Sequence, residues 1–220
     1  NDVANGWFIG QTTQSFYDYE KIGIWQTGEA EAAKAFNQVP GDIKVRDVNG
    51  DGKIDATNDR VILGSGRPSW IGNLNNDFKF MNFDLNVQLF ARWGQMLRYA
   101  FNGVYDPQAN ENSLIHNYWT PENASNDFPR PNASKSQSAT LYYSSLFYKD
   151  GSFLKLRGIT LGYTLPKSVV NKIHVSNLRV YVSGRNLWTY SKIEDYDPER
   201  GGNFTNPMTK LFVGGVNIDF

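Results

Sequence analysis

The last nine residues, FVGGVNIDF (Phe212–Phe220), indicate most clearly how this chain folds. Apolar residues and glycine alternate there with a second set that becomes polar towards the end. The first set is Phe212, Gly214, Val216, Ile218 and Phe220, and the second is Val213, Gly215, Asn217 and Asp219. Successive side chains point to opposite faces in an extended strand. The pattern therefore predicts a β-strand with one apolar and one polar face.

Three upstream segments show the same alternation: Ser69–Phe80, Asp84–Trp93 and Leu178–Gly184. In each, apolar side chains occupy one face and mostly polar side chains the other, which predicts three more strands. Phe153–Leu165 is also predicted to be a strand, but both of its faces carry apolar residues, so its orientation stays open. Thr12–Trp25, rich in Phe and Tyr, is a weaker sixth candidate.

The composition excludes several classes of protein. The 22 basic and 22 acidic residues give a formal net charge of zero, which argues against a nucleic-acid-binding domain. Without Cys, disulfides and cysteine nucleophiles are excluded. Strong helix formers gather only in Gly28–Asn37, and no apolar run is long enough for a membrane-spanning helix. A mean hydropathy of −0.50 with 15% aromatic residues is compatible with a transmembrane β-barrel, whose strands are apolar only at alternate positions.

The connections between the expected strands differ in length. Met81-Asn82 forms a tight turn and Pro166–Asn177 a moderate one, whereas three connections are long: Gln26–Pro68, Gly94–Gly151 and Ser191–Thr209. Short turns at one end and long loops at the other are typical of outer-membrane barrels. This pattern predicts an all-β fold in which six or so antiparallel strands carry three extracellular loops. A soluble β-sandwich, which also alternates, is the alternative from periodicity alone.

Four segments together resemble the C-terminal part of the SusC/RagA-type TonB-dependent outer-membrane transporters of Bacteroidetes. They are GIWQTG (Gly23–Gly28) leading into Pro40–Gly64, Phe78–Gln95, Lys149–Lys167, and Leu178–Glu199 with the terminal GGVNIDF. The resemblance implies a 22-stranded barrel around an N-terminal plug. Residues 1–220 are then expected to form one C-terminal barrel fragment, without the plug and the earlier strands.

The same resemblance implies a function. It indicates an outer-membrane importer of oligosaccharides or peptides, with no enzymatic activity and no nucleic-acid partner. The expected partners are a SusD-like surface lipoprotein, the TonB-ExbB-ExbD system acting through the plug, the barrel assembly machinery and outer-membrane lipid. The long segment 94–151 is expected to be the variable extracellular loop. A soluble calcium-dependent carbohydrate-binding β-sandwich is the alternative function.

An acidic stretch within residues 40–64 follows the spacing of an EF-hand-type calcium loop. Its candidate ligands are Asp47, Asn49, Asp51, the Lys53 carbonyl, Asp55 and Asp59. Oxygen donors at alternate residues can converge on one Ca²⁺, and Gly52 permits the sharp turn. The twelfth position is Asn58, however, so the expected carboxylate falls one residue late. A structural calcium ion and a metal-free turn built from Asp and Asn side chains are both compatible with this sequence.

Two further groups of residues are candidates for function. Aromatic side chains in or beside the longest loop could stack on sugars or hold peptide side chains, or could pack against the loop itself or against a partner's lid. They are Tyr105, Tyr118, Trp119, Phe128, Tyr142 and Tyr143. The alternating apolar residues that end in Phe220, with Ile218 and Val216, resemble the signal that the barrel assembly machinery recognises.

Three carboxylates near the C-terminus suggest an enzyme only at first sight. Asp195, Asp197 and Glu199 could form the acid/base pair of a glycoside hydrolase. In the family that the chain resembles, this motif is a loop segment without catalysis. No catalytic residue is therefore predicted.

Overall fold

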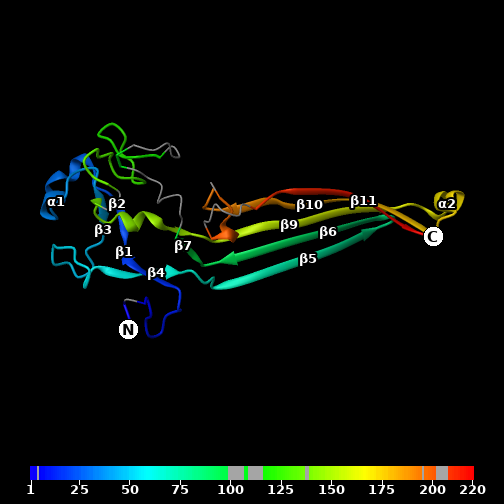
Figure 1. Cartoon of the computed structure of the whole chain (residues 1–220), viewed down its shortest axis with the longest axis horizontal. Coiled ribbons are helices and arrows are strands. Elements are labelled where there is room, and N and C mark those ends of the chain that lie inside the picture. The colour runs from blue at the N-terminus through cyan, green and yellow to red at the C-terminus, as the bar shows by residue number, and fades with distance from the viewer. Residues whose placement is uncertain (4, 99–106, 109–115, 137–138, 195, 202–207) are drawn as a thin grey trace. The chain divides into compact units, whose positions relative to one another are not determined.

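The computed structural model describes all residues except 4, 99–106, 109–115, 137–138, 195 and 202–207. The described chain divides into two compact units (Figure 1). The first comprises Asn1–Arg67 and Met96–Lys149, and the second comprises Pro68–Gln95 and Asp150–Phe220. Among the described residues, no helix is both long and apolar enough to cross a membrane.

The second unit is built on one antiparallel sheet of five strands. Its spatial order is β11-β10-β9-β6-β5, and the long strands run side by side in Figure 1. The strands are β5 (Trp70–Phe80), β6 (Phe83–Trp93), β9 (Phe153–Thr164), β10 (Asn177–Ser191) and β11 (Leu211–Asp219). Each alternating segment predicted from the sequence lies in one of these strands.

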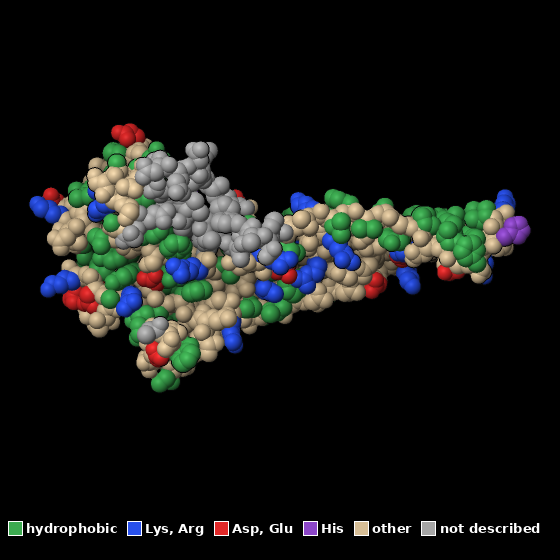
Figure 2. Space-filling model, in the orientation of Figure 1, with side chains coloured by type: hydrophobic (Ala, Val, Ile, Leu, Met, Phe, Trp, Pro, Cys, Tyr) green, Lys and Arg blue, Asp and Glu red, His purple; other side chains and the backbone are tan. Residues whose placement is uncertain are grey.

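The two faces of this sheet differ as the alternation predicts. On one face, Val87 pairs with Ile159, Leu85 with Leu161, and Val180 with Val216. This face stays largely exposed, and Figure 2 shows hydrophobic side chains gathered over the sheet near α2 (Lys167–Val170). The opposite face carries mostly polar side chains, because period-two alternation assigns neighbouring residues to opposite sides.

The turns of the sheet follow the predicted difference in length. Met81 and Asn82 form a tight turn, in which Met81 adopts a left-handed conformation at φ 53°. The connection from β9 to β10 contains α2 and the 3-10 helix η5 (Asn171–Ile173). The end of β11 lies beside this connection, because the Ser176 amide donates to the Asp219 carbonyl at 2.8 Å. The two long connections leave the other end of the sheet (Figure 1).

The first unit contains short two-stranded sheets. β1 (Ser15–Tyr19) pairs with β4 (Arg60–Ser65), β2 (Lys21–Ile24) with β3 (Ile43–Val45), and β7 (Met96–Arg98) with β8 (Tyr148–Asp150). Thr12–Trp25 was expected as a sixth strand beside the others. It forms β1 and β2 instead, so the large sheet has five strands in the described chain.

Two helical elements complete the first unit around its core. The 3-10 helix η1 (Thr27–Glu29) continues into α1 (Ala30–Ala35), and both overlap Gly28–Asn37, where strong helix formers gather. A second 3-10 helix, η4 (Tyr143–Phe147), precedes β8. The buried core brings together residues from β2, β3, η4 and the loop before Phe128: Ile24, Ile43, Val45, Trp119, Tyr143 and Leu146.

Candidate functional site

The polar face of the five-stranded sheet is a connected hydrogen-bonding surface. Arg179 of β10 donates from Nε to Asp84 Oδ1 at 2.8 Å, and from a terminal nitrogen to Oδ2 at 2.5 Å. The pair reaches across Gly162 of β9, where a Cβ atom would overlap both side chains. The Arg–carboxylate fork thus joins β6 to β10 over a strand that has no side chain at that point.

A second polar group on this face lies nearer to β5. Asn86 donates from Nδ2 to Asn75 Oδ1 at 2.9 Å and to Asp77 Oδ1 at 2.7 Å. All three side chains are exposed in these contacts. The face therefore combines fixed amide and carboxylate groups with access for water or a polar ligand.

The acidic loop is held together by its own side chains. Asp47 accepts hydrogen bonds from the amides of Gly50 and Gly52 at 2.7 and 2.9 Å. Asp59, only 1% exposed, accepts from the amides of Val48 and Asp55 at 2.8 and 2.7 Å. The hydrogen bonds of Asn58 and Thr57 to Asp55 lower the pKa of that carboxyl group. The loop thus closes with carboxylates that accept from its backbone.

This arrangement bears on the predicted calcium site. Asn49 donates to Asp51 at 2.9 Å, and both oxygens of Asp59 are used by backbone amides. Within the described residues, no group of three or more Asp, Glu or His side chains is placed to hold a metal ion. Calcium binding stays a prediction.

The loop aromatics named from the sequence separate into different environments. Trp119 and Tyr143 are buried in the core of the first unit, and Trp119 Nε1 donates to Gln26 Oε1 at 3.0 Å. Tyr142 and Phe128 pack against this core, while Tyr118 is exposed. Most of them therefore pack in or against the core of the first unit, which also contains β2 and β3. Tyr105 lies outside the described residues.

The proposed assembly signal lies at the free end of β11. Val216 and Ile218 are exposed on the apolar face of the sheet, and Phe220 is 92% exposed. These side chains form no part of a core in the structure. They are accessible, as recognition by another protein requires.

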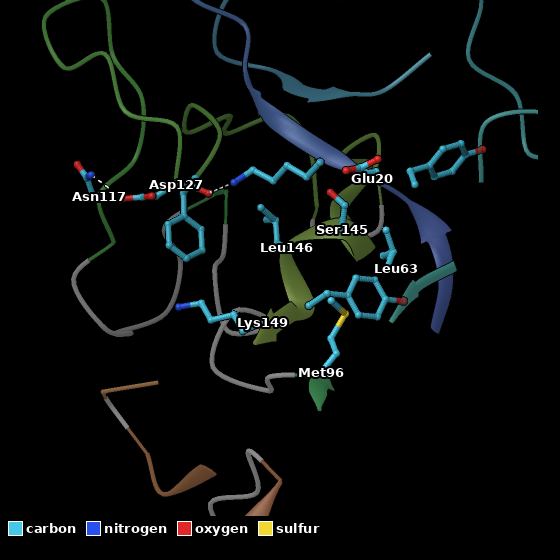
Figure 3. A pocket seen from close by; sticks show the side chains of 12 residues that line it. Glu20, Leu63, Met96, Asn117, Asp127, Ser145, Leu146 and Lys149 are labelled. Carbon is cyan, nitrogen blue, oxygen red and sulfur yellow. Dashed lines mark hydrogen bonds between the residues drawn. The ribbon is translucent and has the colours of Figure 1, made fainter. Parts of the chain in front are cut away.

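A cavity of about 640 Å³ in the first unit was not anticipated from the sequence (Figure 3). The Lys21 ammonium lies at its wall and donates to the carbonyls of Asn126 and Asp127 at 2.7 and 2.8 Å. Burial lowers the pKa of Lys21, against the opposing effect of Asp127. Six separate stretches of chain build this cavity, so no local motif could have indicated it.

Tyr148 lines the same cavity, and Asp18 fixes its hydroxyl group. Its hydroxyl donates to Asp18 Oδ2 at 3.0 Å. Burial and the neighbouring Asp18 raise the pKa of Tyr148 to about 12. The hydroxyl is thus a neutral donor already committed to Asp18, and the cavity offers polar binding groups.

Comparison with known proteins defines the class. No family model matches the chain. The chain is 32% identical over its whole length to TonB-dependent receptor P3 of Formosa agariphila, and 31% identical over 89% of its length to receptor P26 of that organism. It spans about a fifth of the length of these relatives, 22% and 20%. The class is that of the TonB-dependent receptors.

Two further similarities concern the type of receptor. The chain is 26% identical over 96% of its length to the TonB-dependent receptor SusC of Bacteroides thetaiotaomicron. A solved structure of the RagAB peptide transporter matches 94% of this chain and 23% of its own, with a TM-score of 0.68 and 23% identity. These findings confirm the resemblance, the all-β fold class and the outer-membrane localisation. The relatives are receptors and transporters, not enzymes.

Proposed function

We propose that this chain supplies part of the wall and outer loops of a TonB-dependent importer. The main observation that supports this proposal is a sheet with one exposed apolar face and one hydrogen-bonded polar face. In a barrel wall, the apolar face contacts lipid hydrocarbon and the polar face lines the lumen. Transport itself belongs to the whole receptor. This chain spans about a fifth of the length of its relatives.

The substrate class that we propose is oligosaccharides, with peptides as the alternative. The amide and carboxylate groups of the polar face suit a polar, hydrogen-bonding cargo of either kind. The RagAB relative is described as a peptide transporter, which keeps peptides in consideration. The exposed Tyr118 offers an aromatic face to such a ligand.

The partners follow from the same proposal. A SusD-like surface lipoprotein would capture ligand over the long loops. TonB, ExbB and ExbD would act on a plug outside this chain. The barrel assembly machinery would recognise the C-terminal residues Val216, Ile218 and Phe220, which are exposed on the last strand.

The soluble carbohydrate-binding alternative is less compatible with the structure. A β-sandwich buries the apolar rows of one sheet against a second sheet. In the described part of the second unit, all five strands belong to one sheet, and Phe78, Val182 and Phe212 stay exposed on its apolar side. A large exposed apolar face of this kind is stable when it contacts lipid or another apolar surface.

The test uses the complete receptor in its own cell. The gene is deleted and restored either intact or without the codon for Phe220, and growth is measured on oligosaccharides or on peptides as the limiting nutrient. We expect growth on one oligosaccharide class to need the intact gene, and loss of Phe220 to reduce receptor in the outer membrane. Normal growth on every nutrient after deletion, or receptor recovered in the soluble fraction, would contradict the proposal.

A further inference from the structure

Lys155 is a fully buried cation on the polar side of β9. Its side chain is 0% exposed, and the neighbouring Phe90 and Phe153 of the same face are buried as well. A buried ammonium is strongly unfavourable unless ionised partners and hydrogen bonds compensate it. The groups that compensate the charge of Lys155 therefore indicate the role of this residue.

The partners come from the segment that follows β10. Lys155 Nζ donates to both oxygens of Asp197, at 2.8 and 2.6 Å, and to Glu199 Oε2 at 2.8 Å. Arg157 of the same strand donates to the other oxygen of Glu199. Both carboxylates lie in or beside the 3-10 helix η6 (Pro198–Arg200), 42 and 44 residues away along the chain.

The segment itself is shaped around these contacts. Asp197 also accepts from the Glu199 amide at 2.9 Å, which caps η6 while Lys155 neutralises the carboxylate. Ile193 and Pro198 are buried. Residues 196–200 are thus docked on the sheet, and Lys155 is the fully buried charge at the centre of the contact.

The charges facing Glu199 come from two strands. Burial alone raises the pKa of Glu199, but Lys155 and Arg157 of β9 and Arg92 of β6 outweigh this effect and hold the pKa below its ordinary value of 4.5. Arg157 also stacks over the Phe90 ring at 3.7 Å, which fixes its guanidinium beside the carboxylate. Within the described residues, the cluster therefore comprises three cations and two carboxylates.

We propose that Lys155 is a positioning residue that fixes the start of the β10–β11 connection on the polar face of the sheet. The docked segment, residues 196–200, lies over Lys155 on this face. Lys155 determines whether it stays there, because removal of its ammonium leaves two largely buried carboxylates with insufficient compensation. This inference concerns the docked segment and does not depend on which substrate the receptor carries.

Hydrogen exchange of the complete receptor in detergent tests the contact. Lys155→Met is expected to accelerate amide exchange in residues 192–201 about a hundredfold at pH 7, the order of effect of breaking a buried ion pair. The peptide covering 83–93 in β6 should keep its protection, which shows that the sheet stays folded. Lys192→Met is the matched control, because Lys192 pairs with Asp150 at 3.2 Å but is 79% exposed. It should change exchange less than threefold.

The pH dependence separates positioning from general stability. In the wild type, Glu199 stabilises docking above its unfolded pKa, and this contribution is lost as the pH falls through the lowered folded value. Exchange in residues 192–201, corrected for the intrinsic rate, should therefore rise in acid. In Lys155→Met this rise in acid should be smaller, because Glu199 has lost one of the cations that lower its pKa, while Arg157 and Arg92 remain.

A neutral variant completes the test. Lys155→Met combined with Asp197→Asn and Glu199→Gln removes the buried charges while nearly preserving shape. We expect it to regain most of the protection of residues 192–201 and to lose the pH dependence. Unchanged protection in Lys155→Met at pH 7, or a wild-type pH dependence in that variant, would overturn the proposal. A triple variant as unprotected as Lys155→Met would overturn it as well.

Discussion

Asp59 connects the two ends of the acidic loop. It is nearly fully buried and accepts hydrogen bonds from the amides of Val48 and Asp55 with its two oxygens. Asp59→Asn replaces one acceptor with a donor that faces an N–H group. We expect a loss of about 1–3 kcal/mol in local stability, which is typical of a buried hydrogen bond left unmade. Hydrogen exchange of residues 47–59 in the complete receptor measures it.

A matched substitution in the same loop serves as the control. Asp51 accepts from the Lys53 amide at 2.9 Å, but this contact is exposed to solvent. Asp51→Asn should therefore leave exchange in the loop nearly unchanged. Equal effects of the two substitutions would show that Asp59 does not close the loop.

Calcium binding by the same loop is a separate prediction. Alternating oxygen donors from Asp47 to Asp55 favour a hard cation, and adding Ca²⁺ to the chelated receptor should slow exchange in residues 47–59. Asp47→Asn should weaken the response, whereas Mg²⁺ should reproduce little of it. Exchange that is identical with chelator and with Ca²⁺ would identify a metal-free turn closed by its own carboxylates.

Residue types in a local pattern reveal some contacts and miss others. The acidic loop could be recognised because its members lie within a short stretch. The contact between Lys155 and Asp197 could not, because the two residues are 42 positions apart and lie in different segments of the sequence. Nor did the sequence distinguish Trp119 and Tyr143, which are core residues, from the exposed Tyr118.

At the scale of the element, β9 explains why its orientation could not be predicted. Leu154 and Leu156 pair with Ala91 and Leu89 on the apolar side. Beyond them, Gly158 pairs with Gln88, so Arg157 is an extra residue in a β-bulge. The bulge shifts the apolar positions from even to odd numbers, and Leu161 then faces the same side as Leu156. Alternation read across a bulge therefore places apolar residues on both faces.

Thr12–Trp25 shows a second limit of pattern reading. Its aromatic residues are compatible with a strand, but the segment divides at Glu20 into β1 and β2. These strands pair with β4 and β3, which come from a connection with little alternation of its own. Strand propensity predicts extended structure, whereas the pairing partner depends on packing that a single segment does not encode.

Two adjacent glycines in β11 provide a matched prediction at this scale. Gly215 lies beneath the Tyr181 ring, where a Cβ atom would be 2.5 Å from the ring, whereas Gly214 has its nearest neighbour at 4.0 Å. Gly215→Ala should therefore displace Tyr181 and cost about 1–3 kcal/mol, as overpacking does. Gly214→Ala should be tolerated. The thermal unfolding midpoint of the purified receptor compares the two, and equal midpoints would contradict the packing described here.

At the scale of the whole molecule, the two units have different roles. The second unit is a sheet in which alternation of apolar and polar residues in the sequence predicted one apolar and one polar face. In a barrel wall, neighbouring residues alternate in this way because one faces lipid and the next faces water. The first unit carries the acidic loop, the aromatic core and the cavity of Figure 3, and it is assembled from long connections without periodic patterns. Such loops differ among relatives and are where substrate specificity is expected.

The central claim is that the apolar face of the sheet contacts lipid while the polar face contacts water, and one labelling experiment tests it most directly. The chain contains no Cys, so single cysteines can be placed in turn at Val180, Tyr181, Val182 and Ser183 of β10, in a receptor otherwise free of Cys and reconstituted in lipid vesicles. Each is labelled with a fluorophore and quenched by spin-labelled lipid or by aqueous iodide. We predict lipid quenching at positions 180 and 182 and iodide quenching at 181 and 183. Iodide quenching at all four positions would contradict the account.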